Sequence, residues 1–212
     1  MKAVVFDLDG VLVDSEWASA KAWRSVLERF GYDFDAATFE GFVGHTDRAL
    51  AEFFAPHVGR TPSAILDSAE RELREVAAAG LIAFPDALSV LERLVSPLAV
   101  ATNSDRWRLE LILSAAGIRE RFPISVAGDE VQAPKPAPDI YLRAAQLLGV
   151  APADCLVVED SPTGLAAAVQ AGMAVVAVRR GYFDPEDLVL ANEVVDSLTE
   201  SSLLSSLFLQ VP

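Results

Sequence analysis

The pattern that most constrains the fold is the alternation of short apolar runs with longer helical segments after residue 82. This alternation is typical of βαβ units, in which parallel strands are joined through helices. Each run is almost continuously apolar, as expected for a strand that is covered on both faces. The sequence therefore predicts an α/β fold, a doubly wound parallel sheet. The candidate strands are Ala3 to Phe6, Leu98 to Thr102, Ile124 to Ala127, Cys155 to Glu159 and Ala174 to Val178.

The segment between the first strand and the rest of the sheet has a different pattern. It shows helical periodicity and no convincing strand. Gly31 follows the first amphipathic stretch, where a helix C-cap is expected. Thr61 and Pro62 supply an N-cap and a proline at the first position of a later helix. We therefore expect a core domain with an inserted all-helical domain, with the core made of residues 1–14 and 83–212 and the insertion of residues 15–82.

Charge and composition limit the kinds of partner. The chain has 31 acidic and 17 basic residues, a net charge of -14, and such a surface repels the phosphate backbone of nucleic acids. No stretch approaches the roughly 18 apolar residues that a membrane span needs. The single cysteine, Cys155, gives no sign of an oxidising compartment. We therefore expect a cytoplasmic protein that binds neither nucleic acid nor membrane, and the sequence leaves its oligomeric state open.

Paired acidic residues follow two of the candidate strands. Asp7 and Asp9 follow the first strand, and residues two apart on an extended chain point the same way. Glu159 and Asp160 close a later strand. Because ligand sites of parallel α/β sheets lie at the carboxyl ends of the strands, we expect these four carboxylates to converge, and a hard cation such as Mg²⁺ would offset their repulsion. Acids on a solvated loop are the alternative, and Ca²⁺ would require more oxygen ligands.

Two further segments suit a phosphate group. Thr102, Asn103 and Ser104 close a candidate strand and precede a helical pattern from Asp105 to Ala116, so hydroxyl, amide and helix N–H groups would be available to an anion. Lys135 is a cation between two prolines that restrict its backbone. The alternatives are a simple helix cap for Ser104 and a solvated loop position for Lys135.

These elements occur in the order Asp-x-Asp-Gly, Thr-Asn-Ser, Lys-Pro and Glu-Asp, and in this the chain resembles the haloacid dehalogenase (HAD) superfamily. The resemblance covers residues 1 to 14 and about 83 to 180. Two segments further resemble the subfamily with a helical cap after the first motif, which includes β-phosphoglucomutases and many sugar-phosphate phosphatases. These segments are Lys135-Pro136-Ala137-Pro138-Asp139 and Val158-Glu159-Asp160-Ser161-Pro162-Thr163-Gly164.

The resemblance implies a Mg²⁺-dependent phosphatase that hydrolyses a small phosphate monoester, such as a sugar phosphate, through an aspartyl-phosphate intermediate. By this resemblance Asp7 attacks phosphorus, while Asp9 donates a proton to the leaving oxygen and later takes one from water. Asp7, the Asp9 carbonyl and Asp160 would hold Mg²⁺, with Glu159 reaching it through water. The helical insertion would be a cap that excludes water and selects the leaving group. The groups that would bind the transferring phosphoryl are Thr102, Asn103 and Lys135.

The resemblance leaves phosphosugar mutase activity as the alternative. β-Phosphoglucomutases carry a His before a basic residue, Ala and Trp, where this chain has Ser19 ahead of Ala20-Lys21-Ala22-Trp23. They also carry an Arg directly after a Gly-x-Ser, where this chain has Gly44-His45-Thr46-Asp47 and then Arg48. A mutase must hold a second phosphate, so these departures favour hydrolysis. The candidate substrate contacts are Trp23, His45 and Arg48, with helix core and surface positions as the alternatives for Trp23 and His45.

Two other functions fit the residues less well. Dehalogenases of the same superfamily use an Asp nucleophile but need neither a metal nor an acid at the position of Asp9. A receiver-like signalling domain also accepts phosphate on an Asp beside a bound Mg²⁺. It has no use for a helical insertion or for Asp9, and we therefore expect an enzyme.

Overall fold

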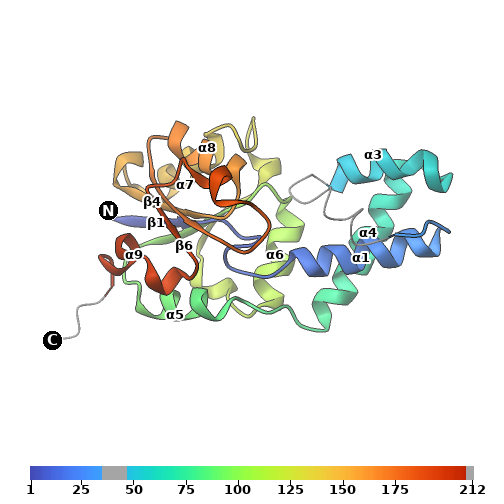
Figure 1. The fold of residues 1–212 in the computed structure, drawn as a ribbon, viewed down its shortest axis with the longest axis horizontal. Coiled ribbons are helices and arrows are strands. Elements are labelled where there is room, and N and C mark those ends of the chain that lie inside the picture. Colours follow the sequence, from blue (N-terminus) through green and yellow to red (C-terminus); the bar gives the residue numbers. More distant parts are fainter. Residues whose placement is uncertain (35–46, 209–212) are drawn as a thin grey trace. The chain divides into compact units, whose positions relative to one another are not determined.

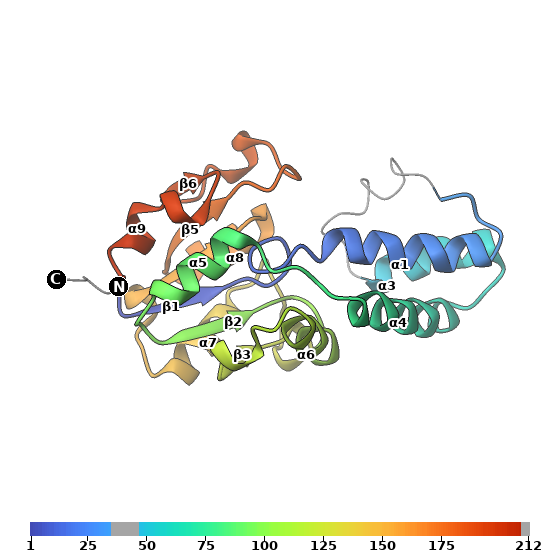
Figure 2. The same cartoon turned by 90° about the horizontal axis from the view of Figure 1, so that it is seen from below.

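A parallel sheet forms the centre of the core (Figure 1). The computed structural model describes residues 1–34 and 47–208. In these residues the sheet has six strands in the order β3-β2-β1-β4-β5-β6, and Figure 2 shows β3 and β6 toward opposite edges. The strands are β1 (Ala3–Phe6), β2 (Leu98–Ala101), β3 (Ile124–Val126), β4 (Cys155–Glu159), β5 (Ala174–Val178) and β6 (Glu193–Val195).

The five predicted strands are present, and β2 and β3 each end one residue earlier than predicted. Every residue of β1 and of β4 is buried, which explains their continuous apolar sequence. The prediction missed β6, because Glu193–Val195 is a short and partly exposed edge strand without a continuous apolar run. The predicted helix after β2 is one residue shorter at each end, as α6 (Arg106–Ala115).

Helices cover both faces of the sheet. Helices α7 (Asp139–Leu148) and α8 (Pro162–Gln170) lie on one face, and α5 (Pro85–Arg93) and α9 (Ser202–Ser205) lie on the other (Figure 1). Buried side chains of α7 and α8, among them Tyr141 and Leu165, pack against the inner strands. The predicted fold class, a doubly wound parallel sheet, is confirmed. No helix in the described part of the chain combines the length and apolar character needed to cross a membrane.

Contacts divide the chain into two compact units, Met1–Asp14 with Ile82–Pro212, and Ser15–Leu81. The helices described in the second unit are α1 (Glu16–Arg29), α3 (Asp47–Val58) and α4 (Pro62–Ala78), and α4 packs against both others. The helix ends follow the sequence signals. The Thr61 hydroxyl accepts a hydrogen bond from the Ala64 N–H at 3.3 Å, and Gly31 follows α1 with a φ of 84°.

Candidate active site

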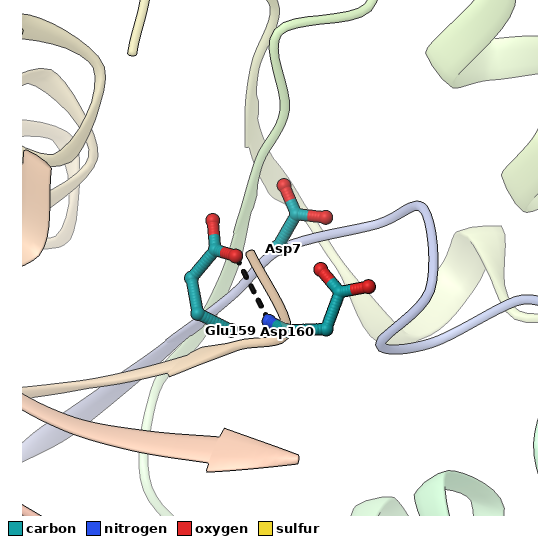
Figure 3. Close-up of side chains that lie close together, drawn as sticks. All are labelled: Asp7, Glu159 and Asp160. Atoms are coloured by element: carbon teal, nitrogen blue, oxygen red, sulfur yellow. Dashed lines mark hydrogen bonds between the residues drawn. The ribbon is translucent and has the colours of Figure 1, made fainter. Parts of the chain in front are cut away.

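Three carboxylates meet at the carboxyl edge of β1 and β4. Asp7 follows β1, Glu159 ends β4, and Asp160 follows it. One oxygen of each residue lies within 4.8 Å of those of the other two, and the carboxylates gather in one place in Figure 3. The register explains this, because Phe6 lies opposite Val158 and the next residue of each segment emerges at the same edge. The structure therefore brings together three of the predicted metal ligands.

The Lys135 ammonium joins two of these acids. Its Nζ donates to Asp7 Oδ1 at 2.5 Å and to Glu159 Oε1 at 2.7 Å, and its side chain is 3% exposed. The Tyr141 hydroxyl donates to the same Glu159 oxygen at 2.7 Å. The alternative of a solvated loop lysine is wrong, because Lys135 is a buried cation between two buried carboxylates.

Asn103 fixes the backbone of Lys135. Its Oδ1 accepts from the Lys135 N–H at 2.8 Å, and its Nδ2 donates to the Lys135 carbonyl at 3.1 Å. Both ends of the Asn103 amide are therefore used to position the lysine. Asn103 was predicted to bind the phosphoryl group. In the structure its amide contacts Lys135, which is another predicted phosphate ligand.

Both carboxylate oxygens of Glu159 accept hydrogen bonds. Besides Lys135 and Tyr141 on Oε1, its Oε2 accepts from the Asp160 N–H at 2.9 Å and from the N–H and hydroxyl of Ser161 at 3.0 Å each. These donors stabilise a carboxylate that is fully buried. They also attach it to the start of α8, where Ser161 is the N-cap.

The buried charges change one another's protonation. Burial raises the pKa of Asp7 well above its usual range, Lys135 opposes this, and the negative charges of Glu159 and Asp9 add to it. Burial also disfavours ionised Glu159, but Lys135 and the hydrogen bonds lower its pKa below the ordinary value. Burial disfavours charged Lys135, but Asp7 and Glu159 raise its pKa above the ordinary value, so it stays protonated. One lysine thus faces several acids, and a cation bound beside them would favour the ionised form of Asp7.

The donor atoms at this edge fit Mg²⁺. The groups gathered there are carboxylate oxygens, and Mg²⁺ prefers one or two carboxylates together with water and phosphate oxygens. Asp7 and Asp160 emerge from adjacent strands, so one small ion could contact both. No nitrogen or sulfur ligand belongs to the cluster among the described residues, which argues against a softer metal.

The Asp9 carboxylate faces the loop after β2. Its Oδ2 accepts from the Thr102 hydroxyl at 3.1 Å and from the Ser104 hydroxyl at 3.0 Å. The Arg108 guanidinium on α6 lies 3.7 Å from Oδ1. The Asp9 side chain is 18% exposed, so a bound molecule can reach it. The alternative of a simple helix cap for Ser104 is wrong, because the N-cap of α6 is Asp105; the Ser104 hydroxyl orients Asp9.

Two of the three candidate substrate contacts of the helical unit lie in the described residues, and they differ in exposure. Trp23 is 2% exposed, and its indole N–H donates to Asp47 Oδ1 at 2.9 Å. Trp23 therefore lies in the core of the helical unit, which was the alternative to a substrate contact. The Arg48 side chain is 81% exposed and lies 3.3 Å from Glu52. His45 lies outside the described residues.

Replacing Gly10 with Ala is expected to lower kcat by about 100-fold through displacement of Asp160. Gly10 has a φ of 77°, and an added Cβ would lie 2.0 Å from Asp160 Oδ2. The control is Gly172→Ala, because Gly172 has a φ of 74° but nothing within 4 Å of an added Cβ. Steady-state kinetics and thermal melts should show comparable destabilisation in both variants but a loss of kcat in Gly10→Ala alone. Equal kcat values would contradict the assigned contact.

Residues 1–172 match the haloacid dehalogenase-like hydrolases. The chain belongs to this family. The predicted HAD resemblance and the predicted enzyme class, a HAD-family hydrolase, are therefore confirmed.

Several relatives of this HAD hydrolase carry names that state a substrate. The fructose-1-phosphate phosphatase YqaB of Escherichia coli is 34% identical over 83% of this chain and 95% of its own length. The validoxylamine A 7'-phosphate phosphatase of Streptomyces hygroscopicus is 32% identical over 94% of this chain and 95% of its own length. Both are phosphatases of small phosphorylated metabolites.

Solved structures of HAD relatives share the whole fold. CbbY of Rhodobacter sphaeroides in complex with xylulose-(1,5)bisphosphate has a TM-score of 0.84 and 26% identity, covering 99% of this chain and 100% of that chain. A β-phosphoglucomutase-like protein of Thermotoga maritima has a TM-score of 0.83 and 26% identity, covering 98% of this chain and 100% of that chain. The fold is therefore shared with a protein that binds a sugar bisphosphate and with a β-phosphoglucomutase-like protein.

Proposed function

We propose that this HAD hydrolase is a Mg²⁺-dependent phosphatase of small phosphorylated metabolites that works through a phosphorylated Asp7. The observation that carries the proposal is the Lys135 ammonium between Asp7 and Glu159, with Asp160 in the same cluster. Asp7, the proposed nucleophile, lies beside a fixed cation that can bind a phosphoryl oxygen. The named phosphatases among the relatives support the same class of substrate.

In the proposed reaction, a carboxylate oxygen of Asp7 attacks phosphorus and the bond between phosphorus and the leaving oxygen breaks. Asp9 donates a proton to that leaving oxygen and then removes one from the water that hydrolyses the aspartyl phosphate. The Thr102 and Ser104 hydroxyls orient the Asp9 carboxylate for both proton transfers. Lys135 stays protonated and meets the negative charge of the transferring group.

The residues that would hold Mg²⁺ are the Asp7 carboxylate, the Asp9 carbonyl and Asp160, with Glu159 acting through water. The bound ion would neutralise charge on the phosphoryl oxygens. Asn103 contributes by fixing Lys135. We also propose that residues 15–82 act as the cap, and that Trp23, His45 and Arg48 belong to the part of the chain that distinguishes leaving groups.

Magnesium is expected to stabilise the folded chain. A ligand at about 100 times its Kd adds about 2.7 kcal/mol, which raises the Tm of a chain of this size by about 5 to 10 °C. Differential scanning calorimetry with and without Mg²⁺ measures this. The Asp160→Asn variant should lose the shift, whereas Asp154→Asn should keep it, because Asp154 is an exposed residue paired with Lys2. An equal shift in both variants would rule out Asp160 as a ligand.

The test of the function is phosphate release from a panel of hexose, pentose and carboxylic-acid phosphates with Mg²⁺. We expect each protein molecule to release many molecules of free phosphate. The panel includes β-glucose 1-phosphate with its bisphosphate, because conversion to the 6-phosphate without free phosphate would identify a mutase. A single labelling of the chain without turnover would instead identify a phospho-acceptor signalling domain.

A further inference from the structure

The loop that carries Asp9 is attached to a partly buried arginine from another part of the core. Arg180 lies just beyond β5, and its side chain is 11% exposed. Its Nε donates to the Gly10 carbonyl at 3.2 Å, and its Nη2 donates to the Val11 carbonyl at 3.4 Å. These two peptide groups follow Asp9 directly. Arg180 therefore restrains the turn that determines where Asp9 lies.

The same guanidinium is held from the opposite side. Its two Nη atoms donate to the two Asp86 carboxylate oxygens at 3.2 and 3.1 Å, and its central carbon lies 3.9 Å from the centre of the Phe84 ring. Asp86 accepts further hydrogen bonds from the Ala87 and Leu198 N–H groups at 3.0 and 2.8 Å. A bidentate pair with a stacked ring fixes the plane of a guanidinium, which a lysine could not reproduce.

The partners of Arg180 lie where the chain leaves and re-enters the core. The Phe84 N–H donates to the Leu12 carbonyl at 3.0 Å, and the Asp14 N–H donates to the Ile82 carbonyl at 3.2 Å. The outgoing and returning segments are thus hydrogen-bonded to each other inside the core unit. Arg180 connects the turn on the first segment with Asp86 after the second.

We propose that Arg180, fixed by Asp86, is a positioning residue that holds the Gly10 and Val11 peptides and thereby places Asp9 for proton transfer. The inference rests on the proposed function of Asp9. Arg180 acts through the backbone and has no contact with the reacting atoms. Lys135 is held independently by Asn103, so loss of Arg180 impairs the reaction step and leaves the Lys135 contact to the phosphoryl group in place.

The test compares Arg180→Ala with Arg179→Ala. Arg179 is the neighbouring residue and forms an ion pair with Asp196, and both side chains are at least 38% exposed. We expect Arg180→Ala to lower kcat by about 10- to 100-fold, the cost of a small misplacement at a reacting centre, with KM within about 3-fold of the wild type. Guanidinium ion at millimolar concentration should restore part of kcat in Arg180→Ala only. Arg179→Ala should behave as the wild type.

A second measurement separates this inference from the proposed function. Amide hydrogen exchange of residues 8–14 should be faster in Arg180→Ala than in Arg179→Ala while exchange of β1 and β4 is unchanged. If Arg180→Ala does not fold, Arg180→Lys serves, because it keeps the charge beside Asp86 and loses the carbonyl contacts. If the wild type has no phosphatase activity, the proposed function is contradicted. The amide hydrogen exchange of residues 8–14 then tests whether Arg180 holds this turn. Unchanged kcat in an active enzyme, or unchanged exchange of residues 8–14, would overturn the inference.

Discussion

Replacing Asp7 with Asn is expected to lower kcat by at least about 1,000-fold, because the amide cannot attack phosphorus. The variant should remain folded, since Lys135 keeps Glu159 as a buried partner. Steady-state phosphate release measures the first expectation, and thermal unfolding measures the second.

The matched control for this variant is Asp154→Asn. Asp154 precedes β4 at the end of the strand opposite to the site, and it pairs with Lys2 at 2.8 Å on the surface. The control loses one carboxylate but should retain wild-type kcat. If Asp7→Asn turned over substrate at the wild-type rate with Mg²⁺ present, Asp7 would not be the nucleophile.

Replacing Lys135 with Met should lower the free energy of unfolding substantially. The change leaves Asp7 and Glu159 buried without their shared cation, and removing one partner of a buried ion pair costs about 3–5 kcal/mol of unfolding free energy. Urea unfolding measures the loss, and phosphate release should fall below detection. Lys2→Met is the control, because this lysine is 71% exposed and surface changes stay within about 0.5 kcal/mol.

The loss of stability in Lys135→Met should depend on pH. Without the cation, burial raises the folded-state pKa of both carboxyls relative to the wild type, so the folded variant binds protons more readily than the unfolded chain. Its deficit in unfolding free energy should therefore shrink as pH falls from about 8 to about 5, toward the ordinary carboxyl pKa near 4. A deficit that is constant or grows over this range would argue against uncompensated carboxylates.

The strands and the edge of the sheet that carries the site were predictable because buried parallel strands require continuous apolar runs. Polar residues directly after such runs, as at Asp7 and Glu159, then stand out. β6 gave no such signal, because Glu193–Val195 is short and lies at the sheet edge. The family resemblance, carried by four motifs in order, assigned roles that spacing alone could not.

The supporting contacts of the site could not be predicted from the sequence. Tyr141 is the third residue of an amphipathic helix and becomes informative only when its hydroxyl meets Glu159. The contacts of Arg180 and Arg108 likewise join segments far apart in the chain. Asn103 was assigned to phosphate by motif, yet its amide fixes Lys135. Such pairings depend on tertiary geometry, which a pattern of residue types does not contain.

The most direct test of the mechanism is to trap the phosphorylated side chain. The enzyme is mixed with Mg²⁺ and a phosphate ester that it hydrolyses, and the reaction is quenched during turnover. Borohydride then reduces an aspartyl phosphate to homoserine. Peptide mass spectrometry then locates the product. We expect homoserine at position 7, dependent on both ester and Mg²⁺. Modification at another residue, or none at position 7 in an enzyme that is turning over, would contradict the account.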